Sequence, residues 1–101
     1  MDVFLSKQAE TKLIALSNYL LENWNIKTRN QFFGKLTKRT KQIASHPYSC
    51  PESKEFKGLY KCVVSKHTSF YYRIKSNQKE IEIITVFDSI QNPSSLQMEI
   101  E

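Results

Sequence analysis

The sequence predicts an α+β fold in which two helices cover one face of an antiparallel sheet. Apolar residues recur at helical spacing in the first half of the chain, and after Gly58 the pattern changes to the alternation of strands. The chain has 101 residues, of which 40% are hydrophobic and 12% aromatic, and this suffices for one ordinary core. We therefore expect one domain over residues 1–101: a strand, a helical hairpin and a three-stranded meander.

The first half is expected to form a short strand and then the helical hairpin. Residues Asp2 to Leu5 are β-like, and Ser6 is a suitable N-cap for a helix that runs to about Asn23. Its apolar stripe is Ala9, Leu13, Leu16, Leu20 and Trp24, widened by Ile14 and Leu21. After a short connection over residues 25–28, a second helix ends before Pro47. Its buried side carries Phe32, Phe33, Leu36, Ile43 and Ala44.

Three strands are expected in the second half, with the last two joined by a hairpin loop at residues 76–79. They are Leu59 to Ser65, Ser69 to Lys75 and Ile81 to Asp88. Alternation assigns to the helix-covered face Phe70, Tyr72 and Ile74 of the second strand and Ile81, Ile83, Thr85 and Phe87 of the third. The opposite, open face then receives Ser69, Tyr71, Arg73 and Lys75. Tyr71 is thus the exposed aromatic candidate.

Positive charge is concentrated in two stretches of a chain whose net charge is +5. Residues 27–41 contain no acidic residue and six basic ones: Lys27, Arg29, Lys35, Lys38, Arg39 and Lys41. Seven more lie between Lys54 and Lys79. Such a surface attracts nucleic acid or an acidic protein, although a solubilising helix face has the same composition.

Several classes of protein and site are disfavoured. No apolar run has the about 20 residues of a membrane span, and the N-terminus does not resemble a signal peptide, so we expect a cytoplasmic protein. Cys50 and Cys62 form no CxxC, and His46 and His67 are not at metal-ligand spacing, so no metal or other cofactor is expected. Free thiols are favoured, with a disulfide left open.

No familiar catalytic motif is present. The 2 glycines cannot build a phosphate-binding loop, and neither HExxH nor GxSxG occurs. His67 is interpreted as a solvent-facing turn residue rather than a general base, although a role near the open face stays open. Lys61, Tyr71 and Arg73 are the candidates for binding a target or a nucleic acid there, because cations beside an aromatic ring suit stacked bases.

The order of several short segments is more specific than any one of them. These are VFLSKQAETKL, LENW, a basic helix with phenylalanines, HPYSCPES, GLYKCVVSKHTSFYYRI and IEIITVFDSIQNP. Over about residues 3–93 the chain resembles the RelE/ParE superfamily of toxins from bacterial type II toxin–antitoxin modules. The resemblance implies the fold derived above and a small acidic antitoxin that wraps around the toxin. Its expected contacts here are Lys35, Lys38 and Arg39.

The resemblance also bears on the target. RelE-like members cleave mRNA on the ribosome with arginines, lysines and often a C-terminal tyrosine, whereas ParE-like members inhibit DNA gyrase. Lys61 matches a lysine of the nucleases, but Ser69 and Ile90 stand where arginines are expected, and no tyrosine follows Tyr72. We therefore expect a growth-inhibiting, ParE-like toxin directed at gyrase. A ribosome-dependent endoribonuclease and an inactive or nucleic-acid-binding module remain the alternatives.

Overall fold

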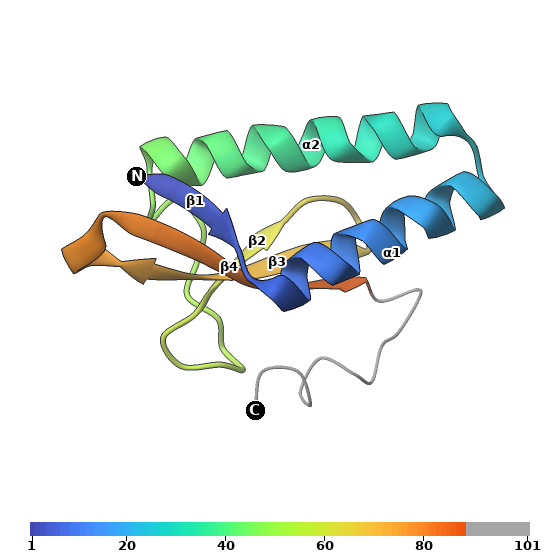
Figure 1. The fold of residues 1–101 in the computed structure, drawn as a ribbon. Coiled ribbons are helices and arrows are strands. Elements are labelled where there is room, and N and C mark those ends of the chain that lie inside the picture. Colours follow the sequence, from blue (N-terminus) through green and yellow to red (C-terminus); the bar gives the residue numbers. More distant parts are fainter. Residues whose placement is uncertain (89–101) are drawn as a thin grey trace.

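A computed structural model describes residues 1–88 of the chain. A strand and two helices are followed by three further strands, as the sequence predicts (Figure 1). The elements are β1 (Asp2–Leu5), α1 (Lys7–Asn23), α2 (Ile26–Ser45), β2 (Tyr60–Val63), β3 (Thr68–Lys75), a 3-10 turn (Ser76–Gln78) and β4 (Glu80–Asp88). The second helix begins earlier than expected, because the Asn25 side chain caps it by accepting a hydrogen bond from the Thr28 amide at 2.8 Å.

The sheet is mixed rather than wholly antiparallel, which corrects one detail of the predicted fold. Its strand order is β1-β4-β3-β2, and β1 runs parallel to β4 while the other neighbours are antiparallel. The meander of β2, β3 and β4 is therefore confirmed, with β1 added at its edge. Alternation along a strand reports which face a side chain occupies but not which strand lies beside it, so the parallel pair carries no local sequence signal.

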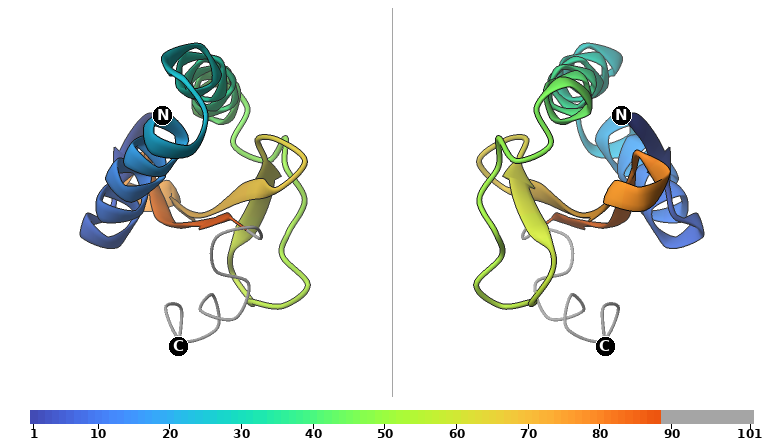
Figure 2. Two further views of the ribbon diagram at one scale, coloured as in Figure 1. Left: turned by 90° about the vertical axis from the view of Figure 1, so that its right-hand side faces the viewer. Right: turned by 90° about the vertical axis from the view of Figure 1, so that its left-hand side faces the viewer.

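Both helices pack on one face of the sheet, and the core lies between the two layers (Figure 2). From the helices it receives Ala9, Leu13, Leu16, Phe32, Leu36 and Ile43. From the sheet it receives Cys62, Phe70, Tyr72, Ile81, Ile83 and Val86. Tyr72 places its hydroxyl in this apolar layer without penalty because it donates a hydrogen bond to the Pro47 carbonyl at 2.7 Å.

The predicted apolar stripe of α1 is only partly buried. Trp24 is 65% exposed, Ile14 57% and Leu21 39%, so these three do not belong to the core. The tip of the hairpin, where α1 passes into α2, extends beyond the sheet in Figure 1. Trp24 follows the last residue of α1 and so lies at that tip. The outer end of the helical hairpin therefore presents apolar surface.

A bulge in β4 changes which side chains face the helices. Tyr72 pairs with Ile83 and Tyr71 with Thr85, so Ile84 has no partner of its own in β3. The extra residue shifts the alternation by one, and Val86 rather than Thr85 enters the core. The expectation that Thr85 and Phe87 face the helices is therefore wrong.

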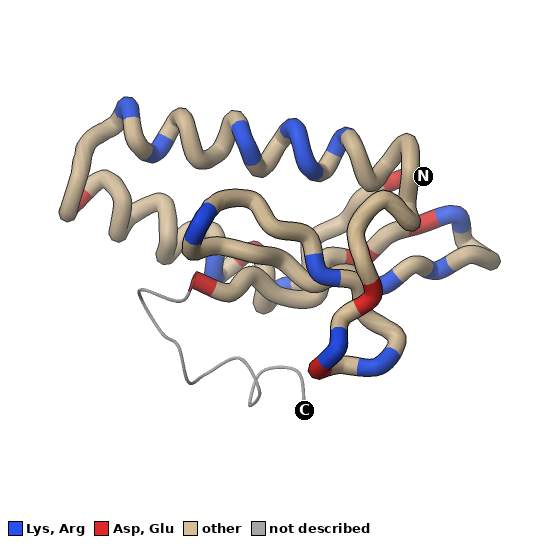
Figure 3. The backbone as a smooth tube through the Cα atoms, turned by 180° about the vertical axis from the view of Figure 1, so that it is seen from behind, with Lys and Arg blue, Asp and Glu red and all other residues tan. Residues whose placement is uncertain are grey.

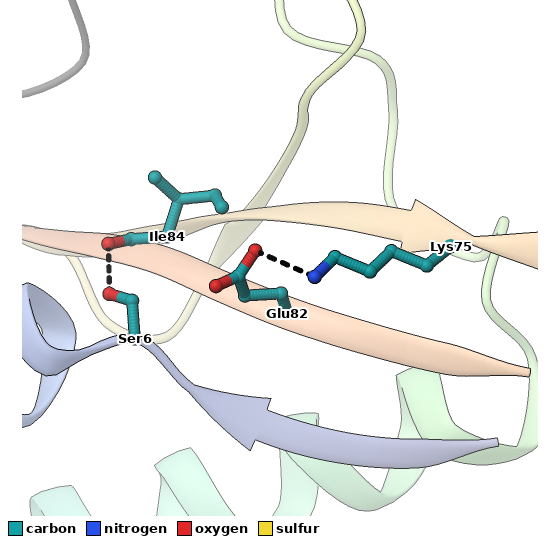
Figure 4. A network of polar contacts seen from close by, with 4 residues as sticks. All are labelled: Ser6, Lys75, Glu82 and Ile84. Carbon is teal, nitrogen blue, oxygen red and sulfur yellow. Dashed lines mark hydrogen bonds and ion pairs between the residues drawn. The ribbon is translucent and has the colours of Figure 1, made fainter. Parts of the chain in front are cut away.

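Ser6 joins this bulge to the start of α1. Its hydroxyl donates to the Ile84 carbonyl at 2.6 Å (Figure 4). The same hydroxyl accepts from the Ala9 amide at 3.0 Å. The backbone amide of Ser6 donates to the Ile83 carbonyl at 3.0 Å. One side chain therefore caps the helix and also hydrogen-bonds the backbone carbonyl of the bulge residue.

Replacing Ser6 with alanine should lower the free energy of unfolding by about 1 to 2 kcal/mol, because the cap and the bulge contact are lost together. Urea denaturation measures this loss. The exposed Thr11→Ala substitution in α1 is the control, with an expected change within about 0.5 kcal/mol. Equal stability of the two variants would contradict the role given to Ser6.

Candidate functional site

Three candidate residues lie on the sheet face turned away from the helices: Lys61 of β2 and Tyr71 and Arg73 of β3. We call them the sheet-face cluster. Lys61 is opposite Tyr71 in the strand register, and its Nζ lies 6.0 Å from the centre of the tyrosine ring. Arg73 is exposed two residues further along β3, opposite Glu82. The Glu82 carboxylate forms an ion pair with Lys75 at 3.4 Å (Figure 4).

Tyr71 is buried, which contradicts its predicted exposure. Its side chain is only 1% exposed, because the ring of Phe56 packs edge-on against it with ring centres 5.6 Å apart. Phe56 belongs to the loop of residues 46–59, which runs from the end of α2 along the outer edge of β2 and continues on the side of the sheet away from the helices (Figure 2). Ser53 shapes this loop by accepting hydrogen bonds from the amides of Glu55 and Phe56. Alternation along β3 predicted the correct face of the sheet for Tyr71, but the loop covers the side chain on that face.

Burial also sets the protonation of Tyr71. The pKa of its phenol is raised, first by burial and then by the negative charge of Glu55. The hydroxyl therefore stays protonated at neutral pH, and the ring offers no exposed surface on which a base could stack. Within this cluster Lys61 and Arg73 are the groups available to a partner.

His67 lies in a separate place from the sheet-face cluster. It is an exposed residue of the turn between β2 and β3, and it lines a groove of about 300 Å³ at the tip of the helical hairpin. We call this the hairpin groove. Its apolar lining consists of Leu16, Leu20, Trp24 and Phe32, and its polar lining includes His67 and Lys35. The structure therefore divides the candidate residues between two surfaces.

The basic face of α2 adjoins the hairpin groove. Lys35, Lys38 and Arg39 are all exposed, and Figure 3 shows Lys and Arg distributed along this helix. Lys35 is the member that lines the groove, while the Arg39 guanidinium donates to the Gln42 side chain at 2.8 Å. No acidic residue occurs in residues 27–41 to neutralise this face.

Residues 1–88 contain no group of three or more His, Cys, Asp or Glu side chains that could hold a metal ion. No helix in the same range is long and apolar enough to cross a membrane.

Comparison with protein families decides the family of the chain. The model of the ParE toxin of the parDE type II toxin–antitoxin system matches residues 3–93. This chain belongs to the ParE toxin family. No protein among the curated sequences compared matches it significantly.

Solved structures share the fold of this ParE-family chain at low sequence identity. A chromosomal ParDE system from P. aeruginosa is similar, with a TM-score of 0.72, 16% identity and coverage of 87% of this chain and 95% of that one. A YoeB/ParE toxin from Agrobacterium tumefaciens has a TM-score of 0.63 and 11% identity, with 87% and 98% covered. The E. coli RelBE toxin–antitoxin complex has a TM-score of 0.59 and 13% identity, with 86% and 94% covered.

Of the two positions expected to carry arginines in a nuclease, the structure places one. Ser69 lies on β3 and is only 9% exposed, whereas Ile90 lies outside the described residues. Sequence reasoning missed two residues of the ParE-family chain, Phe56 over Tyr71 and Trp24 in the hairpin groove. A lone phenylalanine among charges, as in SKEFK, is a weak sign of a loop anchored by an apolar contact. A tryptophan beyond the last turn of α1 is a weak sign of an exposed apolar tip.

Phe56→Ala should uncover Tyr71 and lower the pKa of its phenol toward the usual value of about 10. A raised pKa in the folded state means that stability is lost as pH rises above that value, so the variant should lose less of its stability there than the parent ParE-family chain does. NMR titration of labelled tyrosine rings measures the pKa. Tyr72, buried on the opposite face, is the internal control and should not shift. An unchanged Tyr71 would show that Phe56 does not cause its burial.

Proposed function

We propose that this chain is the toxin of a type II toxin–antitoxin pair that acts in the cytoplasm, inhibiting growth by binding an essential protein, DNA gyrase. The observation that carries the proposal is the sheet face itself: within the domain matched by the ParE family, it presents Lys61 and Arg73 around a tyrosine that is buried. Such a face suits contact with a protein better than cleavage of a nucleic acid.

The chemistry of RNA cleavage explains why. Attack by a 2′-hydroxyl needs a group that takes its proton, cations for the developing charge and an acid for the leaving oxygen. Lys61 and Arg73 supply charge, and Lys61 is the feature that favours the nuclease alternative. Tyr71 is covered and His67 lines the hairpin groove, so neither transfers a proton at this face. The carboxylates nearby are already engaged, Glu82 by Lys75 and Glu55 by the Ser53 hydroxyl. Residues 89–101 contain no Lys, Arg, His or Tyr that would replace these groups.

Contact with a protein has different requirements, and the same face meets them. Val63 lies two residues after Lys61 in β2, on the same face of the sheet, and is 53% exposed. An exposed aliphatic side chain near Lys61, with Arg73 further along the same face, combines apolar area with positive charge. Interfaces between proteins use this combination, in which the apolar centre supplies affinity and the charges orient the partner.

Removing both cations tests the role of this face. A Lys61→Ala, Arg73→Ala double variant should no longer arrest growth when expressed, while its melting temperature stays within about a few degrees because neither side chain is in the core. The matched control removes two cations from α2, Lys27→Ala with Lys41→Ala, and should remain toxic. If the first double variant arrests growth as the parent does, the target-binding site lies elsewhere.

The proposed antitoxin contact lies at the helical hairpin. The hairpin groove is apolar at its centre, and the adjoining helix carries Lys35, Lys38 and Arg39 with no acidic residue in residues 27–41. An acidic amphipathic segment fits this combination, because its apolar side chains can enter the groove while its carboxylates meet the cations. A segment that folds on binding buries the exposed Trp24 as well.

Charge reversal within the groove should weaken this contact more than charge reversal beside it. Lys35→Glu should reduce the affinity for the acidic product of the neighbouring gene by about tenfold or more, and added salt should weaken binding of the parent. Lys41→Glu makes the same change in net charge outside the groove lining and should cost less than about threefold. Co-purification and titration calorimetry measure both. Equal losses of affinity in the two variants would mean that net charge alone drives binding. If the chain does not co-purify with the neighbouring gene product when both genes are expressed, the antitoxin proposal is wrong.

A further inference from the structure

The two cysteines come together in the core from different segments. Cys50 lies in the loop of residues 46–59 and is 7% exposed, whereas Cys62 lies in β2 and is 1% exposed. Both are free thiols, as the sequence favoured. Neither belongs to the sheet-face cluster or to the lining of the hairpin groove.

The backbone places the two cysteines opposite each other. The loop forms an antiparallel bridge with β2 in which Glu52 pairs with Tyr60. The Lys61 amide donates to the Pro51 carbonyl at 3.0 Å, and the Ser53 amide donates to the Leu59 carbonyl at 2.7 Å. Continuing this register by one pair beyond Pro51 and Lys61 sets Cys50 directly across from Cys62.

Opposite residues of an antiparallel ladder form either hydrogen-bonded or non-hydrogen-bonded pairs, and the kind of pair sets the distance that a disulfide must span. Because Pro51 and Lys61 form a hydrogen-bonded position of the ladder, the neighbouring pair of cysteines occupies a non-hydrogen-bonded position. Opposite Cα atoms at such positions are about 4.5 Å apart, with their side chains close together. Disulfides span Cα separations of roughly 4.4 to 6.8 Å, so this pair needs little backbone movement to be bridged.

The protonation of Cys62 agrees with this placement. Burial, and then the neighbouring Cys50 thiol, raise the pKa of Cys62 to about 12. Cys62 is therefore a protonated, enclosed thiol. Cys50 is the more exposed of the two and is the sulfur that a small oxidant reaches first.

We propose that Cys50 and Cys62 are a modification site at which a peroxide forms a reversible intramolecular disulfide. In the first step the Cys50 sulfur attacks hydrogen peroxide, an S–O bond forms, the O–O bond breaks, and one water leaves with the thiol proton. In the second step the Cys62 sulfur attacks the resulting sulfenic acid, the S–S bond forms, and the hydroxyl leaves as water with the Cys62 proton. Two thiols and one peroxide thus give one disulfide and two waters.

The disulfide would link the loop of residues 46–59 covalently to β2. This loop carries Phe56, which covers Tyr71, and the Pro47 carbonyl, which accepts from Tyr72. In the reduced protein, hydrogen bonds and packing hold these contacts in place. A covalent link between residues 50 and 62 would hold the loop against β2, next to Lys61. The inference does not depend on the proposed function.

An equilibrium measurement tests the inference without relying on the rate at which buried thiols react. The full chain is equilibrated in glutathione buffers of graded oxidising strength, from both reduced and oxidised starting material, and then alkylated and weighed. The folded chain should form the disulfide, which is recognised because that chain takes up no alkyl groups and is about 2 Da lighter than the reduced chain before alkylation. This should occur at a value of [GSSG]/[GSH]² roughly tenfold or more below that needed by the urea-unfolded chain. Folded protein that needs the more oxidising buffer would overturn the inference.

Hydrogen exchange and variants complete the test. Oxidation should slow exchange of the Ser53 and Lys61 amides, which join the loop to β2, and reduction should restore it. Cys50→Ser should lose both the mass change and the slowed exchange. Unchanged exchange at these amides in the oxidised chain, or disulfides only between separate chains, would contradict a covalent link within the molecule.

Discussion

The bulge at Ile84 decides which side chains face each side of the sheet. By inserting one residue into β4, it turns Val86 into the core and places Thr85 opposite Tyr71 on the far face. Ser6 makes the bulge compatible with burial, because its hydroxyl donates to the Ile84 carbonyl while accepting from the Ala9 amide. The start of α1 and the register of β4 are thereby tied to one side chain. Ser6 therefore connects the helical layer to the sheet.

The fold presents two separate surfaces that differ in chemistry. On the far face the loop of residues 46–59 covers Tyr71 with Phe56, which leaves Lys61 and Arg73 as accessible charges. On the helix side, the hairpin extends past the sheet and forms an apolar groove bordered by cations. Two separate surfaces of different chemistry suit a toxin with two partners, a target and an antitoxin. A nuclease would instead need its proton-transfer groups gathered on one face.

Periodicity was enough to predict the helices and the meander, since burial of one face imposes spacing on the sequence. It predicted the end of α1 at Asn23 and the strand from Asp2 to Leu5. Periodicity did not predict the features that depend on contacts between distant parts of the chain. These are the parallel partner of β1, the bulge in β4, and the loop that covers Tyr71. Lys61 and Arg73 lie on the expected face, whereas His67 lies in the groove. The roles of these residues remain predictions.

The central claim is that the chain acts on a protein and not on RNA. The most direct measurement combines two readouts in the same induced cells: primer extension on ribosome-bound transcripts, and the supercoiling of a reporter plasmid with a gyrase assay on purified components. The account predicts intact transcripts, relaxed or broken DNA, and inhibition of purified gyrase by the chain. Discrete cuts at fixed codon positions that vanish with Lys61→Ala, together with normal supercoiling, would contradict it and establish an endoribonuclease.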